Sequence, residues 1–202
     1  MASPRTHDPG HVAYPVPEPD CLVVPPTTSS PEVLAYMASA GANIKPPSLA
    51  KIVSGGQAGV DRGALDGALA AGFPAGGWCP EGREAEDGPI PSHYPLVELP
   101  NAGYRERTRK NVADSDGTLV IYFGELSGGT AATVKHCEQL QKPVVVVNGD
   151  TLNAAGAAGQ AAAFIAAHSI AVLNVAGPRE SKHAGARDFS RSVVSFLIAS
   201  RQ

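Results

Sequence analysis

The sequence predicts an α/β fold, a doubly wound parallel sheet with helices on both faces. From Lys51 onward, short apolar runs alternate with amphipathic stretches, which is the pattern of strands that are each followed by a helix. The run Pro143–Asn148 holds four consecutive valines, as expected of a strand that is buried on both faces. Glycines follow several of these runs and mark the turns from strand to helix.

The expected strands are short apolar runs bounded by glycine, proline or polar residues. They are Lys51–Ser54, Thr118–Phe123, Pro143–Asn148 and Ile170–Asn174.

The expected helices share apolar residues at helical spacing. The first follows Gly55-Gly56, with Leu65 and Leu69 on the face of Ala64 and Ala68 and with Arg62 and Asp66 pointing away. The next three are a basic helix Tyr104–Ala113, a helix from Ser127 to about Gln141 and an alanine-rich helix to His168. The last helix has a core-facing stripe of Phe189, Val193, Phe196 and Leu197.

Proline usage divides the chain near residue 48. Ten of the 18 prolines precede Ser48, so residues 1–48 are expected to form a Pro-rich arm. Within the arm, Pro31–Ala42 is suited to one short helix with Ser30 as its N-cap. Residues 49–202 are expected to form a single ligand-binding domain.

Composition narrows the class of protein. The 202 residues carry a formal net charge of −3, which argues against a general nucleic-acid binder. No stretch approaches the ~18 apolar residues of a membrane span, and the N-terminus lacks a secretory pattern. The three cysteines are too far apart for a CxxC motif, and no histidine pair has zinc-ligand spacing. We therefore expect a cytoplasmic protein without a metal site.

Three loops are expected at the carboxyl edge of the sheet, where ligands of such folds bind. They are Ser54–Arg62, Gly124–Thr130 and Asn174–Gly185. Glycines at the start of a helix let backbone N–H groups approach an oxyanion, and the helix dipole favours negative charge there. Neither a Walker GK[ST] nor a GxGxxG spacing is present, and the alternative is that these glycines only make tight turns.

Ordered motifs in this region match a known family: GGQAGVDR, GGWCPEGREAEDGPIP, NVADSDGTL and GPRES. With them, the chain from about Lys51 resembles the molybdenum cofactor carrier family. These are Rossmann-like proteins of a superfamily that includes the LOG-type cytokinin-activating phosphoribohydrolases. The resemblance implies binding of the molybdenum cofactor, a phosphorylated pterin, by a homo-oligomer. Molybdoenzymes or cofactor-synthesis proteins are the implied partners.

The residues expected at the ligand agree with this resemblance. A first cradle comprises Gly55, Gly56, Gln57 and Gly59, with Asp61 and Arg62 at the helix start; a second comprises Ser127, Gly128, Gly129 and Thr130. The alternatives are a helix-start Asp61 paired with Arg62, and a Ser127 that only caps its helix.

The segment Gly76–Pro91 is read as a long loop that is functional or mobile. Trp78 is a candidate to stack on a pterin or to pack in the core, and Cys79 a candidate molybdenum ligand or a buried inert thiol. The acidic residues Glu81, Glu84, Glu86 and Asp87 suit either metal or acid–base chemistry, or simply a solvated loop.

The basic helix leaves two readings open as well. Arg109 or Arg105 could reach the anionic ligand, or the whole row of charges could be a solvated face.

The rival function is a LOG-like hydrolysis of nucleoside monophosphates. That family carries a PGGxGTxxE signature with a catalytic glutamate, whereas Thr133 stands at the corresponding position here. Threonine cannot supply the carboxylate, so we expect no catalytic residue and no enzyme. A non-catalytic nucleotide-sensing domain is the third alternative. The prediction is a binding protein for an anionic pterin or nucleotide-like ligand, with the molybdenum cofactor as cargo.

Overall fold

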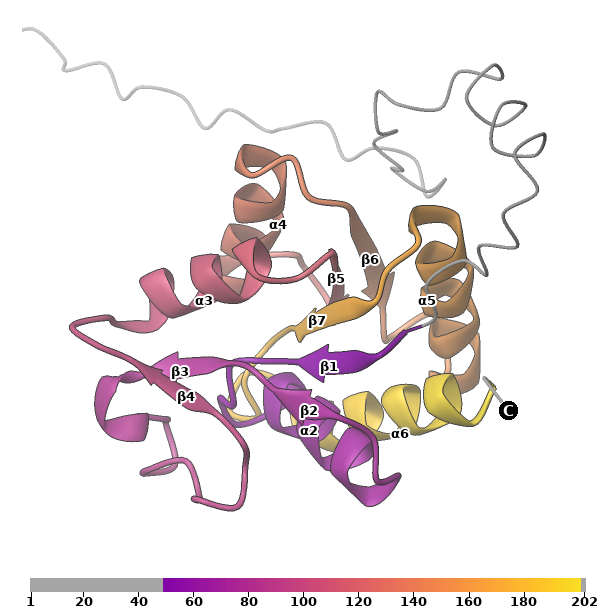
Figure 1. Cartoon of the computed structure of the whole chain (residues 1–202). Helices are drawn as coiled ribbons and strands as arrows, with labels where there is room; N and C mark the ends of the chain where they lie inside the picture. The colour runs from indigo at the N-terminus through magenta and orange to yellow at the C-terminus, as the bar shows by residue number, and fades with distance from the viewer. Residues whose placement is uncertain (1–48, 201–202) are drawn as a thin grey trace, which may run out of the picture.

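The computed structural model describes residues 49–200, and the arm, the helix expected at residues 31–42 and Cys21 lie outside them. Its main sheet has five parallel strands in the order β2-β1-β7-β5-β6 (Figure 1). The strands are β1 (Lys51–Val53), β2 (Ala75–Gly76), β5 (Gly117–Tyr122), β6 (Val144–Asn148) and β7 (Val172–Ala176).

Helices cover both faces of this sheet (Figure 1). One face carries α2 (Val60–Ala70), α5 (Ala154–His168) and α6 (Ala186–Ala199), and the other carries α3 (Tyr104–Ala113) and α4 (Gly128–Gln139). The predicted class, a Rossmann-like doubly wound α/β fold, is confirmed. None of the helices in residues 49–200 is long and apolar enough to cross a membrane.

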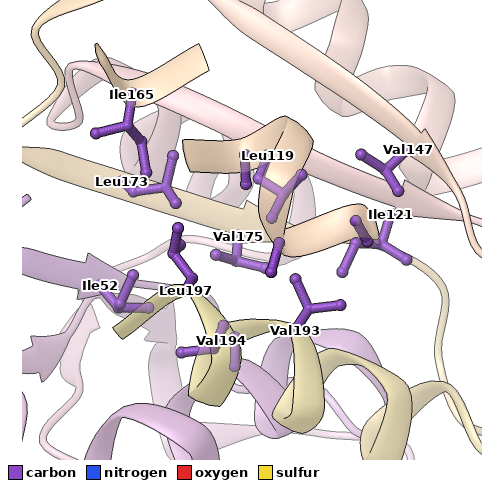
Figure 2. Close-up of a cluster of buried hydrophobic side chains, with 14 of the residues drawn as sticks. Ile52, Leu119, Ile121, Val147, Ile165, Leu173, Val175, Val193, Val194 and Leu197 are labelled. Carbon is purple, nitrogen blue, oxygen red and sulfur yellow. The ribbon is translucent and has the colours of Figure 1, made fainter. Parts of the chain in front are cut away.

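The main core lies between the sheet and the layer of α2, α5 and α6, and Figure 2 shows the side chains that meet there. The labelled residues are Ile52, Leu119, Ile121, Val147, Ile165, Leu173, Val175, Val193, Val194 and Leu197. All are less than 9% exposed, so this layer excludes water and holds the strand ends in fixed positions.

A second, smaller sheet was not predicted. It pairs β3 (Trp78–Pro80) in parallel with β4 (Val97–Leu99), and the short 3-10 helix η1 (Glu81–Arg83) follows β3. The end of β2, β3 and η1 occupy the first half of the segment Gly76–Pro91, which was predicted as a long loop, and β4 lies beyond it. Strands of two or three residues are too short to show a hydrophobic period, because only pairing with a distant partner stabilises them.

Several burial predictions were wrong for reasons of tertiary position. The valine-rich strand β6 lies at the sheet edge, so Val146 is 37% exposed instead of buried. The buried arc of α6 runs through Ser190, Val193 and Leu197, which leaves Phe196 at its margin and 51% exposed.

Helix α2 likewise departs from the predicted pattern. Leu69 is exposed, whereas Arg62, expected to point into solvent, is buried.

Helices α2 and α6 approach closely because α2 carries glycines at the contact. A Cβ on Gly63 would lie 2.1 Å from the carbonyl oxygen of Arg187, and one on Gly67 would lie 2.7 Å from that of Arg191. Backbone cannot move away as a flexible side chain can, so these positions exclude larger residues.

We predict opposite effects for one substitution at two helical glycines. Gly63→Ala should lower the free energy of unfolding by ~1–3 kcal/mol, because the added methyl overlaps the α6 backbone. Gly159→Ala, on α5 with no atom within 4 Å of the added Cβ, should raise it by up to ~1 kcal/mol through helix propensity. Urea unfolding measures both. Stabilisation by Gly63→Ala would contradict the close approach of α2 and α6.

Candidate functional site

One pocket opens at the carboxyl ends of the central strands β1, β7 and β5. Its volume is about 600 Å³, within the usual range for small-molecule sites. The N-termini of α3 and α4 and the loop between β7 and α6 complete its walls. The lining residues are Gln57, Asp61, Tyr104, Arg107, Thr108, Tyr122, Phe123, Glu125, Ser127, Gly128, Gly129, Thr130, Thr133, Ala176, Gly177, Pro178, Arg179, Lys182 and His183.

The start of α4 lies in this pocket as the sequence analysis expected, with Ser127, Gly128, Gly129 and Thr130 in the lining. Ser127 is the N-cap residue, but its side chain makes no capping hydrogen bond. A Cβ on Gly128 or Gly129 would meet no atom within 4 Å, so both glycines border open space. The first N–H groups of a helix have no partner within it, so this end of α4 offers backbone donors to the pocket.

The three glycines of the first predicted cradle, Gly55, Gly56 and Gly59, do not line the pocket. A Cβ on Gly55 would lie 1.5 Å from Nη1 of Arg107, and one on Gly56, whose φ is +76°, would lie 2.4 Å from Leu96. These glycines therefore admit other parts of the protein instead of a bound oxyanion.

Gly59 has the same internal role. It adopts φ +94° at the start of α2, and a Cβ there would lie 2.5 Å from the Pro178 carbonyl oxygen. The glycine thus lets the loop after β1 pack closely on the loop after β7.

Gln57 and Asp61 do line the pocket, and each is fixed by partners. The Gln57 Oε1 accepts hydrogen bonds from the backbone N–H of Ala58 at 3.1 Å and of Glu86 at 2.9 Å. Asp61 Oδ2 accepts from Arg107 Nη1 at 2.9 Å, and both side chains are less than 10% exposed. Burial raises the pKa of the Asp61 carboxyl, while the adjacent Arg107 guanidinium opposes that shift.

Arg62 lies outside the pocket lining, and its partner is neither a ligand nor Asp61. Its guanidinium forms a two-pronged ion pair with Asp87, and its Nε donates to the Gly56 carbonyl at 3.3 Å. The hydrogen bond from Arg62 lowers the pKa of Asp87. Arg62 thus connects the loop after β1 to the acidic segment, residues 81–87.

Trp78 and Arg109 are also outside the lining. Trp78 Nε1 donates to Asp114 at 2.8 Å, and the Lys110 ammonium lies 5.1 Å from the ring centroid. Arg109 is exposed, whereas Arg107 of the same helix reaches the pocket. The spacing of Tyr104, Arg107 and Thr108, which places them on one helix face, is the signal that could have identified this arginine.

The sequence analysis missed the aromatic and basic wall of the pocket. The imidazole of His183 stacks on Phe123 with ring centroids 3.8 Å apart and an interplanar angle of 4°. On the other side, the Arg179 guanidinium lies 5.0 Å from the centroid of Tyr104. With Lys182 also in the lining, the pocket combines flat side chains with positively charged ones.

The acidic segment contacts the loop between β7 and α6 from outside the pocket. Glu86 accepts hydrogen bonds from both the backbone N–H and the hydroxyl of Ser181, and Glu81 accepts from the Asn101 N–H. Cys79 is buried, with its thiol donating to the Val97 carbonyl at 3.6 Å, so the reading of an inert thiol holds. In residues 49–200 no three His, Cys, Asp or Glu side chains gather as a metal site.

Comparison with known families decides the classification. Residues 52–198 match the model of the circularly permutated YpsA SLOG family. The chain belongs to this family.

A solved structure supports the same relationship. It is a crystal structure described as "Putative molybdenum carrier protein", from Syntrophus aciditrophicus SB, and it shares 42% sequence identity with a TM-score of 0.73. The match covers 76% of this chain and 98% of that one. No curated protein gives a significant sequence match. The family resemblance inferred from the motifs is confirmed.

The Arg62–Asp87 pair predicts a loss of stability in acid. A carboxyl whose pKa is lowered by folding stabilises the fold above its unfolded-state pKa of ~3.9 and loses that contribution as the pH falls through the folded-state value. The Asp87 side chain is 48% exposed, so Asp87→Asn should cost at most ~1 kcal/mol at neutral pH. Urea unfolding at neutral pH and near pH ~3 should show the difference from the parent closing in acid. An equal difference at both pH values would contradict a charge effect.

Proposed function

We propose that the pocket binds the molybdenum cofactor as cargo, holding its anionic phosphate at the N-terminus of α4 and its pterin between the aromatic walls. The observation that carries this proposal is the meeting of a glycine-lined helix start with basic and flat side chains in one pocket of about 600 Å³. The related crystal structure, described as that of a "Putative molybdenum carrier protein", supports a cargo that contains molybdenum.

Unpaired backbone N–H groups and positively charged side chains favour the phosphate at the α4 end of the pocket. The first turn of α4 presents backbone donors beside Gly128 and Gly129, where no side chain covers them. Arg179 and Lys182 line the same pocket and would add charge-assisted hydrogen bonds. The net charge of −3 would repel an anion in general, so local donors must supply the attraction.

Flat aromatic side chains favour the pterin ring at the other end of the pocket. Tyr104 and the stacked pair of Phe123 and His183 offer ring faces to a flat heterocycle, the role that Trp78 had been expected to fill. Of the cysteines in residues 49–200, neither Cys79 nor Cys137 lines the pocket, so the proposed hold on the cargo is through phosphate and ring.

We propose further that the protein does not hydrolyse the ligand. Thr133 occupies the lining one turn into α4, where the phosphoribohydrolases carry glutamate, and its hydroxyl donates to the Gly129 carbonyl at 3.0 Å. We expect the carrier to act as a cytoplasmic homo-oligomer that exchanges cargo with molybdoenzymes or cofactor-synthesis proteins.

The cargo proposal predicts that bulk at the α4 N-terminus abolishes loading without unfolding the protein. The parent, purified from a host that makes the cofactor, should carry both molybdenum and pterin. Gly129→Val should weaken cofactor binding about tenfold or more, ~1.4 kcal/mol, because the side chain covers the N–H donors. Metal analysis and pterin fluorescence after oxidation measure the load per subunit.

Gly159→Val is the matched control, since its added side chain also meets open space but lies on α5 away from the pocket. It should load like the parent. Gly56→Val is unsuitable as a binding test, because it would clash with Leu96 and disturb the fold. A folded Gly129→Val protein that loads normally, or a parent with neither molybdenum nor pterin, would refute the proposed cargo site.

The absence of catalysis has its own test. Incubation with adenosine and cytokinin nucleoside monophosphates should release neither base nor ribose phosphate, because Thr133 supplies no carboxylate at the position of the catalytic glutamate. Chromatography of the reaction mixture over hours detects either product. Steady release over many turnovers would overturn the assignment as a binding protein.

A further inference from the structure

The floor of the pocket holds two buried hydrogen-bond donors that the protein leaves unused. They are Nε2 of Gln57 and Nε of Arg107, on residues that are only 5% and 7% exposed. Both residues line the pocket. A buried donor without an acceptor is costly and uncommon, so each of the two calls for an acceptor from outside the described residues, which a bound ligand or water can supply. The third such atom in residues 49–200, Nδ1 of His136, belongs to a residue outside the lining.

The orientation of the Gln57 amide is decided by its surroundings. Two backbone N–H groups, those of Ala58 and Glu86, approach the same side-chain atom at 3.1 and 2.9 Å. Only the amide oxygen can accept both, so the NH₂ group is the end left without a partner. Gln57 therefore presents a donor, and it cannot reverse without breaking two hydrogen bonds.

Arg107 is held just as firmly, with an acceptor beside it. Its Nη1 donates to Asp61, and the missing side chain of Gly55 makes room for its guanidinium. Asp61 also lines the pocket, so the floor offers a carboxylate next to the two unused donors. The arrangement requires a ligand edge that carries both an acceptor and donors.

We propose that Gln57, Arg107 and Asp61 recognise the 2-amino-4-oxopyrimidine edge of the ligand. The ring carbonyl accepts from Gln57 Nε2 and Arg107 Nε, and the ring N–H and amino groups donate to Asp61. This inference rests on the proposed function and orients the cargo, with the pterin ring toward the floor and the phosphate toward α4. It makes the three residues determinants of ring specificity, separate from the phosphate cradle.

Simple nucleotides test the floor, because guanine carries the same edge as a pterin. GMP has the carbonyl, the ring N–H and the 2-amino group; IMP lacks only the 2-amino group; AMP has an amino donor in place of the carbonyl and no ring N–H. Titration calorimetry on the parent should show GMP bound at least tenfold more tightly than AMP, with IMP between them. Equal affinities for GMP and AMP, or no binding of either, would overturn the proposed recognition.

Gln57→Glu tests the donor directly. The substitution keeps an oxygen for the N–H groups of Ala58 and Glu86 but replaces the unused NH₂ with a second oxygen. In a variant that circular dichroism shows to be folded and that still binds either nucleotide, the preference for GMP over AMP should disappear or reverse. Gln160→Glu, the same change at an exposed position on α5, should keep the parent preference. An unchanged preference in Gln57→Glu would refute the role of Gln57.

Arg107→Lys is the second test, and it replaces Gln57→Glu if that variant does not fold. Lysine keeps a cation for Asp61 but has no Nε donor. The substitution should also reduce the ratio of GMP to AMP affinity several-fold, and an unchanged ratio would remove Arg107 from the proposal.

Gly129→Val separates this inference from the proposed function. It should weaken GMP and AMP by the same factor and leave their ratio unchanged, since it alters only the phosphate end. A retained preference without any effect of Gly129→Val would refute the phosphate cradle and leave the floor standing.

Discussion

The placement of β7 between β1 and β5 is the constraint on which the site depends. Parallel pairing on both of its edges brings together the carboxyl ends of three strands that are far apart in the sequence. Buried polar contacts reinforce these pairings: the Ser54 hydroxyl donates to the Val175 carbonyl at 2.7 Å, and the Asn174 amide donates to the Thr118 hydroxyl at 3.3 Å. Without this insertion, the loop after β1 and the start of α4 would not share a pocket.

The glycine-rich loop after β1 shows how a phosphate-loop pattern can serve the protein's own packing. Gly55 admits the Arg107 guanidinium, Gly56 admits Leu96, and Gly59 admits the loop after β7. The side chains between them, Gln57 and Asp61, are thereby carried to the floor of the pocket. The glycines contribute to the site indirectly, because they set the position of these polar groups without contacting the space that a ligand would fill.

The acidic segment acts as a brace on two of the three pocket loops. Glu86 uses its backbone N–H to hold the Gln57 amide and its carboxylate to hold Ser181, while Asp87 holds Arg62. Groups that are positioned before binding lose little conformational freedom when a ligand arrives. Three of the carboxylates that looked suited to metal or acid–base chemistry, those of Glu81, Glu86 and Asp87, are thus occupied by hydrogen bonds or an ion pair within the protein.

Local features of this protein were determined by the sequence alone. The alternation of strands and helices, the helix Tyr104–Ala113 and the glycine-lined start of α4 follow from short-range periodicity and turn chemistry, and the structure reproduces them. The strand order, the small β3–β4 sheet, the choice of Arg107 over Arg109 and the removal of Arg62 and Trp78 from the pocket were decided only by tertiary structure. These depend on which distant segments pair and which side of a helix meets them, and a local hydrophobic period carries no information about that partner.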